Sequence, residues 1–324
     1  MKAIMCKTHG SPDSLVFEDI AEPELKAGQV RVGVKACGVN FPDVLMVAGK
    51  YQMQPPLPFS PGAELAGEIL QTAPDVTRFQ SGQRVIALSA FGGMAEQICV
   101  PQQVVIPIPD EMPYETAAAF LYTYGTSYYA LKQRARLQRG ETLLVLGAAG
   151  GVGLAAVDLG HLLGATVIAA ASSPEKLAMA REYGATQTID YKQDSLKEQV
   201  LELTGGKGAD VIYDPVGGEL FDQCLRCVAW NGRILVVGFA SGTIQDIPAN
   251  LTLLKGLSVV GVFWGRFAKE EPAAHNQNTK ELFDYYAKGD IRPKISGSFT
   301  LENGAKAIAT LSERRAIGKI VVTI

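Results

Sequence analysis

The fold is decided by the stretch ETLLVLGAAGGVGLAAVDLGHLLGATVIAAASSPEK, residues 141–176. Its first apolar run, Thr142–Leu146, leads directly into a glycine-rich turn, and a helical pattern follows over Val152–Leu163. A second apolar run, Thr166–Ala171, comes next. Short continuous apolar runs are typical of strands that are buried on both faces of a parallel sheet. The stretch therefore predicts a strand, a crossover helix and a second, parallel strand.

The same alternation continues after this stretch. Further strand-like runs are Val211–Tyr213, Arg233–Gly238 and, after a longer connection, Leu257–Val262. Helical patterns separate the runs at Pro174–Tyr183, Ser195–Thr204 and Gly218–Ala229. Buried strands that alternate with helices form a parallel sheet with helices on both faces. We therefore predict an α/β domain with a doubly wound parallel sheet of the Rossmann type.

The two ends of the chain have a different pattern. Up to about residue 109, short alternating runs are separated by Gly and Pro, which predicts a β-rich domain; examples are Gln29–Ala36, Ala66–Gln71 and Arg84–Leu88. The C-terminal part predicts two helices, an extended segment and one last strand, Gly318–Thr323. A single strand cannot bury itself, so we expect it to join the β-rich domain. The predicted domains are residues 1–119 with 264–324, and residues 120–263.

Composition excludes several classes of protein. The chain has 324 residues, 47% of them hydrophobic, and a formal net charge of −3 with scattered Lys and Arg, so no nucleic acid is expected as a partner. No apolar run approaches the about 20 residues that span a bilayer, and no export signal is recognisable, so we expect no membrane partner and a cytoplasmic protein. Five scattered Cys residues agree with a reducing compartment.

The glycine-rich turn predicts a nucleotide site. Small residues between a buried strand and a helix let the backbone approach a pyrophosphate, whose charge the helix N-terminus stabilises. The turn reads Gly147-Ala-Ala-Gly-Gly-Val-Gly153, with Ala148, Gly150 and Gly153 in the glycine positions of the dinucleotide fingerprint. The alternative is a glycine-rich turn without a ligand. The predicted contacts with the cofactor are Ala149, Gly150, Gly151, Val152 and Gly153.

The end of the second strand predicts which nucleotide is bound. Sites that prefer NADH place Asp or Glu there to hold the ribose hydroxyls. Here Ser172 takes that place, and Ser173 and Lys176 follow. Hydroxyl groups and a cation suit a 2′-phosphate, so we predict NADPH. A second interpretation, compatible with the first, is that Ser173-Pro174-Glu175 caps and starts the next helix.

The chain resembles the medium-chain dehydrogenase/reductase superfamily, and within it the quinone oxidoreductase, or zeta-crystallin-like, branch. The resemblance covers essentially the whole chain and is carried by ACGVNFPDVLMVAGKY (36–51), PGAELAGEI (61–69), YGTSYYAL (124–131), AAGGVG (148–153), YDPVGG (213–218) and GKIVVTI (318–324). It implies a GroES-like fold for the β-rich domain and a homodimer, for which the apolar run Leu257–Val262 is the expected pairing edge.

The resemblance also predicts that no metal is bound. Asn40 stands where zinc-dependent members of the superfamily have a Cys ligand, and Ala63 stands at the place of a His ligand. A catalytic zinc needs about three protein ligands. Without zinc, an alcohol or aldehyde is not polarised, so the acceptor must already be electrophilic. A quinone or an α,β-unsaturated carbonyl meets this condition.

By resemblance, Asn40, Tyr51 and Thr126 face the nicotinamide and the acceptor. The alternatives are that Asn40 braces a loop, that Tyr51 belongs to the apolar packing, and that Thr126 caps a helix. The resemblance further places Tyr191 and Arg315 near the 2′-phosphate, with Arg314 as a neighbour that could replace Arg315. Three residues after strand ends are expected near the cofactor: Gly217, Phe239 and Phe263.

The predicted function is reduction of a quinone by hydride from NADPH. One alternative is an enoyl reductase that acts on 2-enoyl thioesters or small enones with the same cofactor. Another is a non-catalytic NADPH-binding protein.

Overall fold

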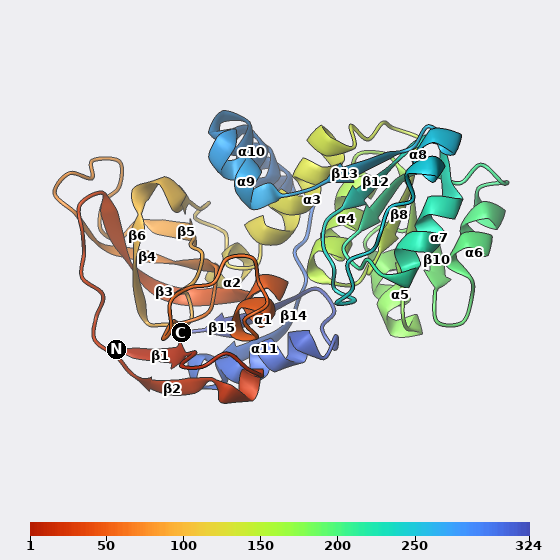
Figure 1. Cartoon of the computed structure of the whole chain (residues 1–324). Helices are drawn as coiled ribbons and strands as arrows, with labels where there is room; N and C mark the ends of the chain where they lie inside the picture. The colour runs from red at the N-terminus through yellow and green to blue at the C-terminus, as the bar shows by residue number, and fades with distance from the viewer. The chain divides into compact units, whose positions relative to one another are not determined.

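The computed structural model describes all residues from Met1 to Ile324 and contains two compact units (Figure 1). The first unit consists of Met1–Tyr122 and Pro293–Ile324, and the second consists of Thr123–Arg292. The second boundary therefore lies at residues 292/293, whereas the sequence places it at 263/264. No helix combines the length and the apolar composition that a membrane span requires.

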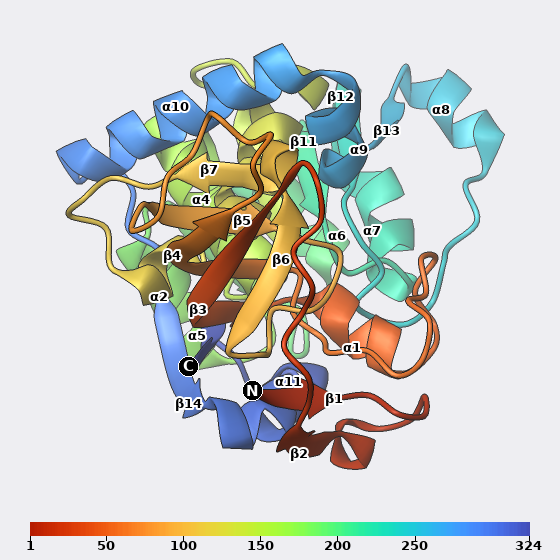
Figure 2. The ribbon, with the colours of Figure 1, turned by 90° about the vertical axis from the view of Figure 1, so that its left-hand side faces the viewer.

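The first unit is built on a seven-stranded sheet centred on the long strand β3 (Gln29–Val39), which Figure 2 shows together with its neighbours. The order is β14-β15-β3-β4-β5-β7, and β6 also pairs with β3. The other strands are β4 (Glu64–Thr72), β5 (Arg84–Leu88), β6 (Gln97–Pro101), β7 (Val105–Pro107), β14 (Ile295–Thr300) and β15 (Lys319–Thr323).

The last strand of the chain joins the β-rich unit, as the sequence predicts, and pairs there with β3. Residues 29–33 of β3 pair with β6, and residues 36–39 pair with β15, while β4 runs along the other edge of β3. The second half of β3 is buried almost throughout, because strands flank it on both edges and helix α2 (Tyr114–Ala117) packs on it. This buried end of β3 leads straight into helix α1 (Phe41–Val47).

Smaller elements complete the first unit. A two-stranded ribbon joins β1 (Lys2–Met5) to β2 (Val16–Asp19). The remaining helical elements are η1 (Pro12–Ser14), η2 (Gln102–Val104), η5 (Leu301–Asn303) and α11 (Gly304–Ser312). Both termini of the chain belong to this unit and lie near each other in Figures 1 and 2.

The second unit contains a six-stranded, wholly parallel sheet in the order β10-β9-β8-β11-β12-β13. The chain moves outward from β8 to β10 and then crosses to β11 on the other edge of β8, which is the doubly wound Rossmann arrangement. Its strands are β8 (Thr142–Leu146), β9 (Thr166–Ala171), β10 (Gln187–Asp190), β11 (Ala209–Asp214), β12 (Val228–Val236) and β13 (Ser258–Gly261).

Helices connect and cover these strands. They are α4 (Gly151–Leu162), α5 (Pro174–Glu182), α6 (Leu196–Leu203), α7 (Glu219–Cys227), α8 (Ala249–Lys255), α9 (Trp264–Glu270) and α10 (Pro272–Lys288). Before β8, the short helix α3 (Thr126–Tyr129) is flanked by two π-helical turns, η3 (Leu121–Gly125) and η4 (Ala130–Arg134).

Packing against α3 explains why α9 and α10 belong to the second unit. The rings of Tyr129 and Phe267 are stacked, with their centroids 4.0 Å apart. The Tyr128 hydroxyl donates to the Glu281 carboxylate at 2.6 Å, and Lys132 forms an ion pair with the same group. These contacts bury aromatic surface. No local sequence pattern predicts these contacts, because α3 and α10 are about 150 residues apart in the chain.

Candidate functional site

The glycine-rich turn adopts a conformation that only very small residues permit. Gly147 follows β8 with a φ of +56°, in the left-handed region that favours glycine. A Cβ on Gly153 would lie 2.2 Å from the carbonyl oxygen of Gly147, well inside van der Waals contact. The turn and the first turn of α4 therefore pack backbone against backbone.

This packing leaves the N-terminus of α4 available to an anion. Gly150 is the N-cap, and its amide donates to the Gly147 carbonyl at 2.9 Å. The amides of Gly151, Val152 and Gly153 lie in the first turn, where no preceding helical carbonyl can accept from them. Together with the helix dipole, these amides can accept a phosphate group as a ligand. Ala149 precedes the N-cap and belongs to the same turn.

Four of the predicted cofactor residues gather at the end of β9. The Lys176 ammonium lies 3.5 Å from the Ser172 hydroxyl, and the Tyr191 amide donates to the last residue of β9, Ala171, at 3.3 Å. The Ser173 hydroxyl accepts from the Lys176 amide at 3.4 Å and so caps α5. The capping interpretation of Ser173 is thus confirmed. It leaves the hydroxyl of Ser172 and the ammonium of Lys176 side by side.

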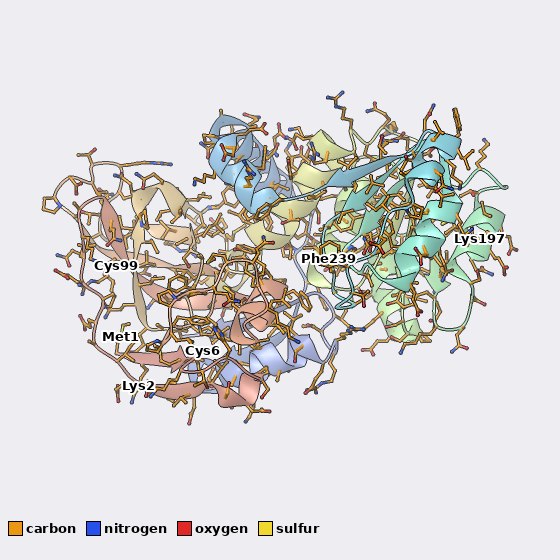
Figure 3. All side chains as sticks on the ribbon, in the orientation of Figure 1. Met1, Lys2, Cys6, Cys99, Lys197 and Phe239 are labelled. Carbon is orange, nitrogen blue, oxygen red and sulfur yellow. The ribbon has the colours of Figure 1, made fainter.

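Three other predicted residues follow the carboxyl ends of β11, β12 and β13, at the edge where parallel α/β sheets bind ligands. Gly217 donates its amide to the Asp214 carboxylate at 2.8 Å. A Cβ on Gly217 would lie 3.2 Å from the ring of Phe239, so these two residues are neighbours. Phe239 is labelled in Figure 3. Phe263 precedes α9 and is 54% exposed.

Thr126 is half-buried within a continuous helical segment. Its predecessor Gly125 holds the N-cap position of α3 and has helical φ and ψ angles of −61° and −45°, so α3 continues the helical turn before it and Thr126 does not occupy the cap position. The next residue, Ser127, was not predicted as a site residue. Its hydroxyl donates to the carbonyl of Val152 in the first turn of α4 at 2.8 Å. Ser127 stands in the quoted motif YGTSYYAL, which was the available signal.

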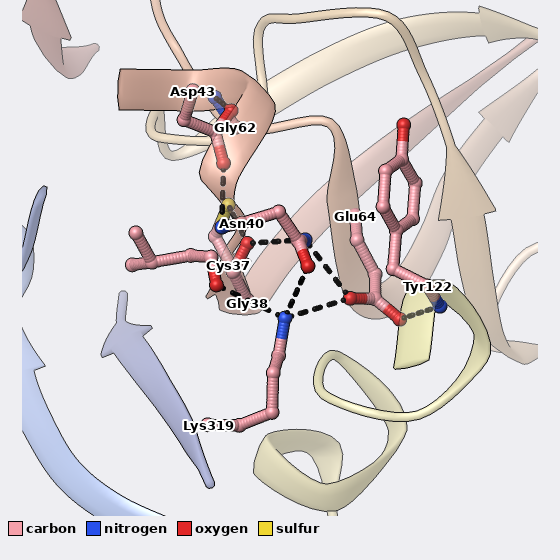
Figure 4. Close-up of polar contacts among 9 residues, drawn as sticks. Cys37, Gly38, Asn40, Asp43, Gly62, Glu64, Tyr122 and Lys319 are labelled. Atoms are coloured by element: carbon pink, nitrogen blue, oxygen red, sulfur yellow. Dashed lines mark hydrogen bonds and ion pairs between the residues drawn. The ribbon is translucent and has the colours of Figure 1, made fainter. Parts of the chain in front are cut away.

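In the first unit, Asn40 lies at the centre of a buried polar cluster (Figure 4). Its amide oxygen accepts from the Lys319 ammonium at 2.7 Å. Its amide nitrogen donates to the Glu64 carboxylate at 3.1 Å and to the Gly38 carbonyl at 3.3 Å. Its backbone amide donates to the Asp43 carboxylate at 2.8 Å. Asn40 therefore braces the junction of β3 and α1, which is one of the interpretations that its sequence position allowed.

Lys319 and Glu64 belong to the same cluster as Asn40, and neither was predicted as a candidate site residue. Lys319 begins β15 and Glu64 begins β4, and their side chains are 6% and 0% exposed. The ammonium lies 3.1 Å from the carboxylate, and the other carboxylate oxygen accepts from the Tyr122 amide at 2.9 Å. The available signal was one Lys in the otherwise apolar run GKIVVTI.

Burial shifts the titration of the groups around Asn40. Burial raises the pKa of Asp43 to about 6, although its carboxylate accepts hydrogen bonds from the amides of Asn40 and Gly62. Tyr51 is half-buried, and burial, followed by the negative charge of Asp43, raises the pKa of its phenol. Tyr51 is therefore a hydrogen-bond donor at neutral pH and not a base.

Arg315 belongs to the first unit, whereas Lys176 and Tyr191 belong to the second. Its guanidinium is exposed and forms an ion pair with Glu313 at 2.5 Å. No group of three or more His, Cys, Asp or Glu side chains is arranged to hold a metal ion.

Comparison with known proteins identifies the family. Residues 26–110 match the alcohol dehydrogenase GroES-like domain, and residues 151–279 match the zinc-binding dehydrogenase family. The chain is 45% identical over 325 residues to the quinone oxidoreductase-like protein 2 homolog of Nematostella vectensis, covering 99% of this chain and 88% of the relative. The chain belongs to the quinone oxidoreductase family of medium-chain dehydrogenases/reductases. Both the resemblance and the fold class are thus confirmed.

Other members of the quinone oxidoreductase family match over their full length. The quinone oxidoreductase of Pseudomonas aeruginosa is 37% identical over 99% of both chains. The crystal structure of Escherichia coli quinone oxidoreductase complexed with NADPH superposes with a TM-score of 0.94, at 28% identity over 100% of both chains. The crystal structure of the Pseudomonas syringae quinone oxidoreductase superposes with a TM-score of 0.93 at 34% identity, and the match covers 100% of this chain and 99% of the other.

Proposed function

We propose that the protein is a zinc-independent oxidoreductase that transfers a hydride from NADPH to a quinone. The observation that carries this proposal is the pairing of two features in the second unit. The glycine turn presents the amides of α4, and the adjacent strand β9 ends just before Ser172, whose hydroxyl lies 3.5 Å from the Lys176 ammonium of α5.

These two features suit the two charged parts of NADPH. The first-turn amides and the dipole of α4 stabilise the pyrophosphate. The Lys176 ammonium and the Ser172 hydroxyl supply a charge-assisted hydrogen bond and a neutral one to the 2′-phosphate. Tyr191 borders the same strand end. The NADPH complex of the E. coli relative supports this assignment. NADPH itself supplies the hydride, and on the first unit Arg315 adds a further candidate cation.

Zinc independence is supported by the residues around Asn40. An amide and a methyl group, at Asn40 and Ala63, stand where zinc-dependent members of the superfamily have two ligands. The nearby carboxylate of Glu64 is already paired with the ammonium of Lys319. A metal ion would therefore have to displace a buried cation and bind without two strong ligands.

The acceptor must then be activated by its own conjugation. In a quinone, the negative charge that develops on hydride transfer reaches a conjugated oxygen, which a hydrogen-bond donor stabilises. Tyr51 is such a donor, because its raised pKa keeps the phenol protonated. The Thr126 hydroxyl and the Asn40 amide are the other polar groups that we assign to orienting the nicotinamide and the acceptor.

The same protonated phenol favours a second candidate, reduction of an enone or a 2-enoyl thioester. These acceptors require a proton on carbon after the hydride arrives, and Tyr51 could deliver it. A panel of quinones, enones and enoyl thioesters, each assayed by NADPH oxidation with and without a strong chelator, separates the candidates. We expect quinones to turn over fastest and the chelator to have no effect. Faster turnover of enones would replace the proposal with the second candidate, and no turnover with any acceptor would indicate a non-catalytic NADPH-binding protein.

We further propose a homodimer that pairs through β13. This strand is the last of its sheet, and the nearby α8 exposes large apolar side chains, with Leu253 at 81% and Leu254 at 67%. The side chain of Trp230 is 70% exposed. It lies on the neighbouring strand β12, three residues before Arg233, which pairs with the first residue of β13. An open strand edge with exposed apolar residues favours pairing with a second copy. Light scattering that gave the monomer mass at assay concentration would exclude the dimer.

A further inference from the structure

We propose that Lys319 is a positioning residue that fixes the orientation of the Asn40 side-chain amide for the hydride-transfer reaction. This inference rests on the proposed function only for its kinetic readout. The observation that carries it is the juxtaposition of one buried ammonium with three oxygens of different kinds, all within the first unit (Figure 4).

The ammonium group has three protons, and three oxygens accept them. These are the carbonyl of Val39 at 3.0 Å, the amide oxygen of Asn40 at 2.7 Å and the carboxylate of Glu64 at 3.1 Å. A lysine ammonium has three donors and no acceptor, so this set satisfies it completely. The Lys319 side chain is 6% exposed, so water cannot easily replace any of the three oxygens.

These contacts determine which way the Asn40 amide faces. In the observed orientation, the amide oxygen meets the ammonium of Lys319 and the amide nitrogen meets the carboxylate of Glu64. Turning the amide by half a rotation would place its NH₂ group against the ammonium and its oxygen against the carboxylate. Both contacts would then be repulsive in a buried environment, where polar mismatches are costly. The two charges therefore hold the amide in a single orientation.

The same pair of charges connects separate parts of the first unit. Asn40 follows β3, while Glu64 and Lys319 begin β4 and β15. The second oxygen of Glu64 accepts from the Tyr122 amide, at the last residue of the unit's first segment. Lys319 is 279 residues from Asn40 in the sequence. Its contribution is thus to fix the geometry around Asn40, and it need not touch the substrate.

Removing Lys319 alone would leave the buried carboxylate of Glu64 without its cation, which is strongly destabilising. Lys319→Met is therefore expected to lower Tm on the order of 10 °C. The informative variant is Glu64→Gln with Lys319→Met, because it removes both charges together and keeps the side-chain volumes similar. We expect its Tm to return to within a few degrees of the wild-type value.

The double variant should bind NADPH with unchanged affinity, because the glycine turn and Lys176 lie in the other unit. Its kcat with the best acceptor should fall by about tenfold or more, since small errors in position are costly to catalysis. In an Asn40→Ala background, the same two substitutions should cause no further loss, because a positioning residue acts only through its target. Lys132→Met is the matched control, since it breaks the ion pair with Glu281 and should leave kcat unchanged.

A readout that is independent of catalysis is the side-chain amide of Asn40 in protein labelled with ¹⁵N-asparagine. In the wild type, the two amide protons should give separate, slowly exchanging signals that Asn40→Ala identifies. In the double variant, these two amide protons of Asn40 should exchange with solvent at least tenfold faster. Unchanged exchange, an unchanged kcat, or losses that add to those of Asn40→Ala would each overturn the proposal. Failure of the proposed quinone chemistry would instead appear in the wild type, and the exchange result would still stand.

Discussion

Tyr213 and Ser127 are joined by a buried hydrogen bond of 2.8 Å between their hydroxyl groups. Ser127 gives its single proton to the carbonyl of Val152, so Tyr213 must be the donor in this pair. These two consecutive hydrogen bonds link β11 and α3 to the first turn of α4. Burial raises the pKa of Tyr213, so its proton remains in place throughout the working pH range.

Breaking these two hydrogen bonds should loosen the glycine-rich turn at the start of α4. Ser127→Ala leaves the buried Tyr213 hydroxyl without its acceptor and removes a hydrogen bond to the carbonyl of the half-buried Val152, at a cost of about 2–4 kcal/mol in the free energy of unfolding. Tyr213→Phe removes one donor and leaves the bond to Val152 intact, so it should cost about 1 kcal/mol. Urea denaturation and NADPH titration measure the two effects. Equal losses, or a greater loss for Tyr213→Phe, would contradict the assigned direction of the bonds.

We expect the preference for NADPH over NADH to depend on Lys176. A charge-assisted hydrogen bond to the 2′-phosphate contributes roughly 1.5–3 kcal/mol. Lys176→Ala should therefore weaken the binding of NADPH roughly tenfold or more and leave the binding of NADH almost unchanged. Lys197→Ala, on α6, is a suitable control for the loss of one positive charge from the same unit. If Lys176→Ala weakened both cofactors equally, the residue would have a structural role.

Gly153 and Gly150 provide a contrast between packing and ligand approach. A Cβ at Gly153 would collide with the Gly147 carbonyl at 2.2 Å, so Gly153→Ala should destabilise the protein by about 1–3 kcal/mol. At Gly150 the nearest atom would be at 3.4 Å, an ordinary contact. The Gly150→Ala variant should therefore fold normally, and only its binding of NADPH should be weakened. Thermal unfolding and cofactor titration of both variants check this. A wild-type affinity for NADPH in Gly150→Ala would mean that the pyrophosphate does not approach this residue.

The sequence predicted the strands of the Rossmann unit wherever an apolar run was continuous. The bounds of β8 and β9 agree with the predicted runs, because both strands are buried on their two faces. The strand β10 was missed, since it is a polar edge strand in which only Ile189 is fully buried. The strand β12 begins at Val228, where a helical pattern was predicted to continue to Ala229. Tertiary packing determines the existence of β10 and the start of β12, and local periodicity does not reveal either.

The candidate site likewise has residues that the sequence predicted and residues that it did not. The glycine turn and the residues at the end of β9 were found because their chemistry is local in the sequence. The contacts of Lys319 with Glu64 and Asn40 span 255 and 279 residues. Such a contact becomes visible only when β3, β4 and β15 are placed side by side. A lysine in an apolar strand is unusual, and in retrospect it was the one local indication.

Asp43 should give folding stability a distinct pH dependence. Its pKa is raised from 3.8 to about 6, so the folded state holds this proton more tightly than the unfolded state does. The stabilising contribution of Asp43 to the free energy of unfolding is therefore largest below about pH 4 and is lost as the pH rises through about 6. The difference in the free energy of unfolding between wild type and Asp43→Asn should follow this curve and become constant above it. A difference that grew with rising pH would mean that the carboxyl pKa is lowered instead.

The chemical step should depend only moderately on Tyr51. If conjugation in the acceptor supplies most of the electrophilicity, positioning against the nicotinamide dominates the rate. Tyr51→Phe removes one neutral hydrogen bond to the developing oxygen and should lower quinone turnover on the order of tenfold. Enones should lose more, because their reduced form needs a proton on carbon, whereas quinone oxygens can take protons from solvent. Rates for both acceptors with wild type and variant decide this. A fall in quinone turnover by several orders of magnitude would make Tyr51 an essential acid and would contradict the mechanism proposed here.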